Sequence, residues 1–314
     1  MSNILYMAPI QGATNYIYRN TYSKFFSGYD VAVTPFLASS PGKMVKRDRL
    51  KDIWPKNNEF KGKLIPQILS KNPADFTALA LAMFDMGYDT VNWNLGCPLP
   101  KVSNKTRGSG LLLNPDLVIS FLDEVLAHIP NKLSIKVRLG KNSPAELFLL
   151  LPRLNAFPLS EIIIHPRTAL QMYKGDVDLN AFEQCLSLTR HTVVYSGDIH
   201  SLENYNELAR RFPSVHGWMI GRGGIVNPFL PEEIIGIPSL GKKESINRFK
   251  EFHKNLVEVY QENYSGPAHV MDKMKELWFY WSQGFEGAQK FYQKVSRIKH
   301  VEQYMDEVNA FLDL

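Results

Sequence analysis

Cys97 is the residue of this sequence best placed to do chemistry. Residues 92–98 read Asn-Trp-Asn-Leu-Gly-Cys-Pro, so the thiol lies just past an apolar strand. The loop that follows is basic and contains Lys101, Lys105 and Arg107. Because an α/β barrel collects its catalytic groups at the carboxyl ends of its strands, we predict a chemical role for Cys97. A buried structural cysteine is the alternative.

The residues beside Cys97 favour the chemical role. Gly96 and Pro98 indicate a sharp, fixed turn that exposes the thiol. Cys185 lies on a predicted helical face and fits a core position better. Two cysteines cannot form a disulfide framework, which fits a reducing compartment. No Cys or His cluster has metal-ligand spacing, so we expect no metal site.

Polar side chains and glycine turns recur where the other predicted strands end. In chain order they are Pro9, Ile10 and Gln11, then Gln67, Asn94, Lys136 and Arg138, His165 and Arg167, Ser196, Gly197 and Asp198, and Gly221 and Arg222. The last two groups are glycine turns, each running into a helix. The loops after strands 7 and 8 of a barrel commonly bind phosphate. We predict a phosphate site there, with a simple tight turn at 221–223 as the alternative.

Lys136 and His165 are two further candidates. Lys136 alternates with the apolar Ile135 and Val137, so we expect it to point into the barrel mouth. A lysine inside a strand is costly unless it meets an anion or a polarised ligand, although a structural ion pair would also serve. His165 ends the sixth strand, where a structural and a catalytic role are both open.

A repeating strand-then-helix pattern must position these groups. Eight apolar runs are predicted strands: 4–9, 31–36, 64–69, 90–96, 133–139, 161–167, 192–198 and 217–223. Helical spacing follows most of them, at 73–86, 115–128, 144–157, 179–189 and 202–212. This pattern predicts an α/β fold, a (β/α)8 TIM barrel. A doubly wound sheet is the competitor, but no Gly-x-Gly-x-x-Gly follows the first strand.

The pattern changes near residue 241. Beyond it four stretches have helical spacing, at 245–263, 269–282, 288–299 and 301–312, and none reads as a strand. We predict a barrel domain over 1–241 and a small C-terminal helical domain over 242–314.

The composition and net charge limit the kinds of partner and compartment that we expect. The 314 residues are 45% hydrophobic and 21% charged, enough for a large core and against disorder. The formal net charge of +5 falls on residues 1–241, while 242–314 is neutral. This modest excess is compatible with a polyanionic partner. With no leader-like start and no long apolar run, we expect a soluble, cytoplasmic protein.

Taken together, these residues resemble the tRNA-dihydrouridine synthase family, flavin enzymes that reduce uridines in tRNA. The resemblance spans nearly the whole chain. It rests on Met7-Ala8-Pro9, Asn94-Leu95-Gly96-Cys97-Pro98, Lys136-Val137-Arg138, His165-Pro166-Arg167-Thr168, Tyr173-x-Gly175, Gly197-Asp198-Ile199 and Gly221-Arg222-Gly223. The stretch 273–280, with 286–288 and 291–292, resembles the helical domain of bacterial members that act in the tRNA D-loop. It favours position 16 over position 20 in tRNA numbering.

The resemblance implies FMN at the barrel mouth and NADPH as reductant. Pro9, Ile10, Gln11, Gln67 and Lys136 would contact the isoalloxazine or ribityl part, with His165 beside it; Ser196, Gly197, Asp198, Gly221 and Arg222 would hold the phosphate end. Flavin N5 would deliver hydride to C6 of uridine, and Cys97 would protonate C5. A thiol with a pKa of roughly 8.5 stays protonated at neutral pH and can act as a general acid.

The resemblance also implies a tRNA surface on a monomer. Asn94, Arg167, Tyr173, Lys273, Lys275 and Arg297 match substrate- or RNA-contacting positions. Lys273 and Lys275 are two residues apart and do not share a helix face squarely. From the residues alone, Lys43, Lys46, Arg47, Arg49 and Lys51 form a basic run that fits phosphate contact or a solvated surface.

Two departures and two alternatives stay open. Ser196 stands where relatives usually carry asparagine, and the loop 105–110 is less glycine-rich than usual. One alternative is a flavin-dependent barrel reductase of a small molecule, of the dihydroorotate or enoate type. The other is a non-enzymatic RNA-binding barrel.

Overall fold

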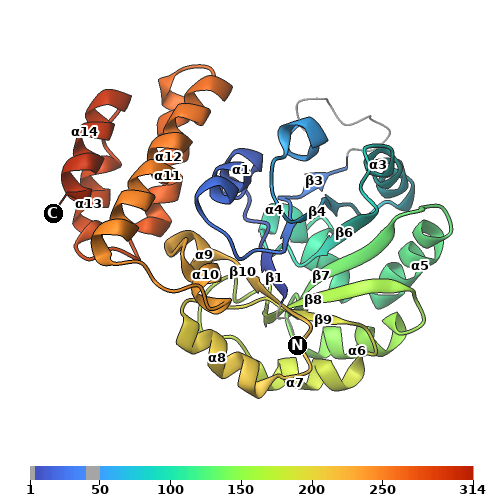
Figure 1. Cartoon of the computed structure of the whole chain (residues 1–314). Coiled ribbons are helices and arrows are strands. Elements are labelled where there is room, and N and C mark those ends of the chain that lie inside the picture. The colour runs from blue at the N-terminus through green and yellow to red at the C-terminus, as the bar shows by residue number, and fades with distance from the viewer. Residues whose placement is uncertain (1–3, 40–49, 314) are drawn as a thin grey trace.

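The computed structural model describes residues 4–39 and 50–313, and over these it contains a closed parallel barrel (Figure 1). Its strands are β1 (Ile4–Met7), β2 (Val31–Val33), β3 (Leu37–Ala38), β4 (Lys63–Ile65), β5 (Gln67–Leu69), β6 (Thr90–Leu95), β7 (Lys132–Gly140), β8 (Leu159–Thr168), β9 (Val193–Tyr195) and β10 (Gly217–Ile220). Strand β10 pairs with β1, Ile4 beside Gly217, and every pairing is parallel. The predicted α/β barrel is confirmed.

Two sides of the barrel are each formed by two short strands. The run 31–36 gives only β2, and β3 follows directly after it, beyond the predicted bounds; the run 64–69 gives β4 and β5. Strand β2 pairs with β4, and β3 pairs with β5, so the pieces continue the same two sides of the barrel. The predicted eighth strand is shorter than expected, because Arg222 already begins helix α9 (Arg222–Val226).

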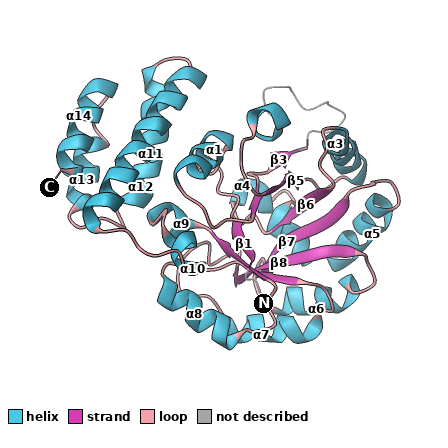
Figure 2. Ribbon diagram, in the orientation of Figure 1, coloured by secondary structure: helices cyan, strands magenta, loops and turns pink. Residues whose placement is uncertain are grey.

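Helices surround the strands on the outside (Figure 2). The barrel helices are α1 (Tyr16–Phe25), α3 (Pro73–Asp85), α4 (Pro100–Ser103), α5 (Pro115–Leu126), α6 (Ala145–Leu154), α7 (Leu179–Leu188), α8 (Leu202–Arg211), α9 and α10 (Leu230–Ile234). Side-chain caps begin several of them. Asn72, Asp178 and Ser201 each accept a hydrogen bond from a backbone N–H in the first turn, which satisfies a donor that the helix leaves unpaired.

Strand residues alternate between two apolar layers. Ile162 and Ile164 pack in the layer under the helices, whereas Ile163 joins Tyr6, Val33 and other residues inside the barrel. This double burial explains why the strands are apolar runs without strict alternation.

The sequence patterns did not predict helix α1. Asn15 caps it by accepting from the N–H of Tyr18, and Ile17, Tyr18 and Tyr22 are buried. Buried Arg19 donates to the carbonyl of Thr14 and pairs with Asp52 at 3.2 Å. The cap and this spacing were present in the sequence as a signal for the helix.

Beyond α10 the described residues form helices and connecting turns, with no strand. The helices are α11 (Lys242–Asn263), α12 (Pro267–Trp281), α13 (Ala288–Val295) and α14 (Val301–Leu312), and Figure 1 shows them together at one end of the molecule. Their core is continuous with α1, because Tyr18, Phe26 and Phe252 share one apolar cluster. Within the described residues no helix is long and apolar enough to cross a membrane.

Candidate active site

A ladder of side-chain amides crosses the barrel interior and ends at Cys97. Gln67 Nε2 donates to Asn92 Oδ1, and Asn94 Nδ2 donates to Gln67 Oε1, each at 2.7 Å. Asn94 Oδ1 accepts the backbone N–H of Gly96 at 3.1 Å and of Cys97 at 2.8 Å. These bonds fix the Gln67 amide orientation and the backbone that carries the thiol.

The thiol itself is buried, contrary to the exposed turn that the sequence predicted. Cys97 is only 7% exposed. The 3-10 turn Gly108–Leu113 covers it, and Ser109 donates to the Cys97 carbonyl through its N–H at 3.2 Å and its hydroxyl at 2.8 Å. Burial raises the pKa of the Cys97 thiol, against smaller opposing effects of Leu99, Arg138 and Lys101. The thiol therefore stays protonated at neutral pH.

Cations gather on the neighbouring strands. Lys136 is half-buried and forms no hydrogen bond or ion pair within residues 4–39 and 50–313. Burial, together with the charge of Arg138, lowers the pKa of Lys136 to about 7. Burial and the charges of Arg138, Lys136 and Arg167 hold the pKa of His165 well below its usual value. His165 is accordingly neutral.

Asp198 ties two arginines together at the end of β9. Its carboxylate accepts from Arg167, and Arg222 donates to it at 3.0 Å. His200 lies 3.6 Å from the same carboxylate. Burial raises the pKa of Asp198, but hydrogen bonds from His200 and Arg167 lower it more, so the net pKa lies well below the usual range. Asp198 is charged at any physiological pH.

Arg167, predicted to contact RNA, is 2% exposed and also donates to the Gly175 carbonyl. It is thus engaged inside the protein. Asn94, also predicted to contact substrate, is engaged in the amide ladder.

The remaining predicted positions border the same mouth. Pro9 and Ile10 are half-buried and Gln11 is exposed, in a loop where Thr14 Oγ1 accepts from the N–H of Ile10 and donates to Ala8. Ser196 and Gly197 are buried directly before Asp198. Gly221 packs near Ala8 and Ile10, because a Cβ there would lie 3.6 Å from Ala8 Cβ. The strand ends therefore come together as expected.

Tyr173 lies at the rim, 53% exposed, between two guanidinium groups. The ring centre is 5.1 Å from Arg138 Cζ and 5.0 Å from Arg222 Cζ. Tyr280 of α12 was not among the predicted site residues. Burial raises its pKa, as do Glu276 and Tyr173, while Arg222 opposes them. This interaction places Tyr280 beside the rim, and no sequence signal relates residues 173 and 280.

The predicted RNA-contacting lysines of α12 point in different directions, as their spacing indicated. Lys273 donates to the Gly12 carbonyl and pairs with Glu276, both at 3.0 Å. Lys275 is half-buried and makes neither contact.

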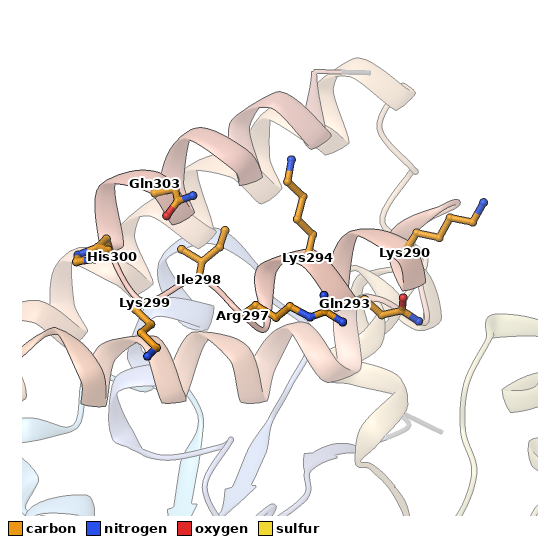
Figure 3. Close-up of a pocket in the computed structure, with 8 residues that line it drawn as sticks. All are labelled: Lys290, Gln293, Lys294, Arg297, Ile298, Lys299, His300 and Gln303. Atoms are coloured by element: carbon orange, nitrogen blue, oxygen red, sulfur yellow. The ribbon is translucent and has the colours of Figure 1, made fainter.

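Arg297 lines a hollow of about 610 Å³ at the turn between α13 and α14 (Figure 3). Lys290, Lys294, Lys299 and His300 line the same hollow, and Lys294 also pairs with Glu307. Of the basic run predicted after the second strand, Lys43, Lys46, Arg47 and Arg49 lie outside the described residues. Lys51 begins a short 3-10 turn. No group of three His, Cys, Asp or Glu side chains suited to a metal ion occurs in the part of the chain that the structure describes.

The closed parallel barrel, with its polar residues at the carboxyl ends of the strands, defines the class: a TIM-barrel enzyme. Two solved structures share this fold. The old yellow enzyme homologue from Zymomonas mobilis superposes with a TM-score of 0.56 at 13% identity, over 76% of this chain and 90% of that one. Morphinone reductase gives a TM-score of 0.54 at 13% identity, over 76% and 87%.

Sequence comparison gives the family. The dihydrouridine synthase (Dus) family profile matches residues 6–314, so the chain belongs to this family and is an oxidoreductase of tRNA modification. The probable tRNA-dihydrouridine synthase 2 of Bacillus subtilis is 26% identical over 98% of this chain and 92% of that protein. The tRNA-dihydrouridine(16) synthase of Neisseria meningitidis is 23% identical over 97% and 93%.

Proposed function

We propose that this protein reduces the C5–C6 double bond of a D-loop uridine in tRNA, with FMN as bound cofactor, NADPH as reductant and Cys97 as proton donor. The observation that carries the proposal is the placement of a protonated thiol and an unpaired lysine at the same barrel mouth. The family profile and the curated relatives support the tRNA substrate. The Neisseria relative supports position 16.

The residues at the mouth fit FMN. Lys136 has no partner among the residues that the structure describes, and its pKa is lowered, which is the state expected of an amine awaiting an anionic or polarised group. Arg138, Arg167 and Arg222 add positive charge, against the single carboxylate of Asp198. We assign the phosphate end to Ser196, Gly197, Asp198, Gly221 and Arg222. The ring and ribityl part belong to Pro9, Ile10, Gln11, Gln67, Lys136 and His165.

When bound and reduced, FMN supplies a hydride to C6 of the uridine. The chain supplies the proton, because the raised pKa keeps hydrogen on Cys97 Sγ until C5 accepts it. Asn94 fixes the backbone of Cys97. The side chains of Asn92 and Asn94 hold the Gln67 amide in one orientation, which also fixes the direction of its remaining N–H. The turn Gly108–Leu113 shields the thiol from water, and it must admit the base.

The helical residues 242–314 would dock the tRNA. Arg297 and its basic neighbours in the hollow at the α13–α14 turn offer phosphate contacts, and Lys275 offers another. Such contacts offset the few kcal/mol that extruding a base from folded RNA costs. Tyr173, exposed at the rim, would meet the incoming uridine.

The test is mass-spectrometric mapping of dihydrouridine in tRNA from cells that lack the gene, complemented with wild type or Cys97→Ala. We expect one D-loop site to lose its two-dalton mass gain and only wild type to restore it. Purified protein should be yellow, and Cys97→Ala should keep the flavin. Unchanged tRNA in the deletion strain, with no redundant activity in extracts, would favour a flavin-dependent reductase of a small molecule instead.

A further inference from the structure

Phe279 exposes an aromatic ring on α12 that the proposed reaction does not use. The side chain is 54% exposed although it lies in the last turn of a helix whose other face is buried. Its neighbours are rings: Tyr280 at 5.3 Å and Tyr292 of α13 at 6.2 Å between centres, both edge to face. This trio, which we call the aromatic platform, presents the Phe279 ring to solvent.

The aromatic platform is continuous with the barrel mouth. Tyr173 and Arg222 both affect the pKa of Tyr280, and Tyr173 packs between Arg138 and Arg222 at the rim. Helix α12 also contacts α9, which begins at Arg222. A Cβ on Gly284, in the turn after α12, would lie 2.7 Å from the Val226 carbonyl. The aromatic platform therefore sits on a helix held rigidly beside the uridine entrance.

Charge on this face argues for a base and against a phosphate. Lys273 pairs with Glu276, and the two remaining charged residues of α12, Asp272 and Lys275, have opposite signs. A group of basic side chains lies instead around Arg297, in the hollow of Figure 3. An RNA that reaches α12 meets a ring on a nearly neutral surface.

We infer that the aromatic platform stacks with an unpaired base of the bound tRNA, next to the uridine that enters the mouth. The inference rests on the proposed function. Extruding one nucleotide leaves its neighbour without a stacking partner, and an aromatic ring can replace that partner for any base type. A ring on a packed helix loses little entropy when it stacks, so the contact adds to affinity.

The experiment measures tRNA affinity of the FMN-loaded protein for Phe279→Ala, Phe279→Leu and Phe279→Trp. Stacking on an aromatic side chain contributes about 1–3 kcal/mol per base, so we expect about 5- to 150-fold weaker binding for the alanine and leucine variants. The tryptophan variant should retain affinity. Leu149→Ala on α6, 68% exposed on the barrel wall, is the matched control and should bind like wild type.

Salt dependence separates stacking from charge. The slope of log affinity against log salt should be unchanged in Phe279→Ala, because no phosphate contact is lost, whereas Arg297→Ala should lower it by about one. Wild-type affinity in Phe279→Ala, or an altered oligomeric state with unaltered tRNA binding, overturns the inference alone. A wild-type protein that does not bind tRNA removes the proposed function, and this inference with it.

Discussion

Asn94 and Cys97 are joined by a 2.8 Å hydrogen bond from the Cys97 backbone N–H to the Asn94 side-chain oxygen. The same Asn94 amide donates to Gln67, which is itself bonded to Asn92. One amide therefore sets both the position of the proposed acid and the orientation of a proposed flavin contact. Because these groups are buried, losing a partner costs more than the bond itself contributes.

Substitution at Asn94 should separate these two functions. Asn94→Asp keeps an oxygen that accepts the Cys97 N–H, but it replaces the donor to Gln67 Oε1 with a second oxygen. Asn94→Ala loses the hydrogen bonds to both Cys97 and Gln67. We expect Asn94→Asp to weaken FMN binding, and Asn94→Ala in addition to lower the rate of tRNA reduction about 10- to 100-fold. Flavin titration and single-turnover kinetics measure the two effects. Equal defects in both variants would contradict separate roles.

The pH dependence of proton donation should follow the buried thiol. Burial raises the pKa of Cys97, so its acid form persists as pH rises above neutrality. We expect the single-turnover rate to stay level to pH 8 and to fall only above the usual thiol pKa of roughly 8.5. Cys97→Ala, with flavin bound, should lose nearly all activity, and its remaining rate should not fall at high pH. A rate that rises with pH would mean that the thiolate is the active form.

Lys136 should lower the stability of the cofactor-free protein. Its folded pKa of about 7 lies below the unfolded value of roughly 10.4, so folding releases its proton between these pH values. The resulting loss of folding free energy is fully present below pH 7, and it declines as pH rises from 7 toward 10. We expect Lys136→Met to stabilise the apoprotein by more than about 1 kcal/mol at pH 6, and less at pH 9. Denaturant unfolding checks this.

The same Lys136→Met variant should bind FMN more weakly, since the cation is lost. A variant with unchanged FMN affinity would remove Lys136 from the proposed cofactor site, whatever its effect on stability.

Asp198 should contribute to stability in the opposite pH direction. Its folded pKa is depressed below the unfolded value of about 3.9, so its contribution is present above that value and is lost as pH falls. We expect Asp198→Asn to destabilise the protein by about 2 kcal/mol or more at pH 7, because Arg167 is left buried without its charge partner. The deficit should shrink progressively as pH falls below the unfolded value of about 3.9, and it should disappear only below the depressed folded pKa. A deficit that stays constant down to pH 2 would point to lost packing.

Gly108 should tolerate no side chain. Its φ of +54° favours glycine, and a Cβ there would lie 2.9 Å from the Cys97 Cβ. Gly108→Ala should lift the covering turn and expose the thiol, so labelling of Cys97 by a thiol reagent should become faster. Gly175→Ala, at φ +66° with nothing within 4 Å, is the control for backbone strain alone.

The barrel and its polar mouth could be predicted because apolar strands recur and because parallel strands bring their carboxyl ends together. The exposure of Cys97 could not, since it depends on Ser109 and Gly108 folding back over the thiol. Helix α1 was missed although its cap, Asn15, and the spacing of its buried residues Ile17, Tyr18 and Tyr22 were present in the sequence. The position of α12 beside α9, which begins at Arg222, depends on tertiary packing that no local pattern encodes.

Helix α1 shares one apolar core with α11 and α12, so the barrel and the helical residues 242–314 are packed together rigidly. Tyr18 and Phe26 would face water if residues 242–314 were removed, so a truncated barrel would aggregate before it could report on catalysis. This shared core therefore fixes the distance between the helical residues and the barrel mouth. In the proposed function, this distance would select which nucleotide of the bound tRNA can reach Cys97.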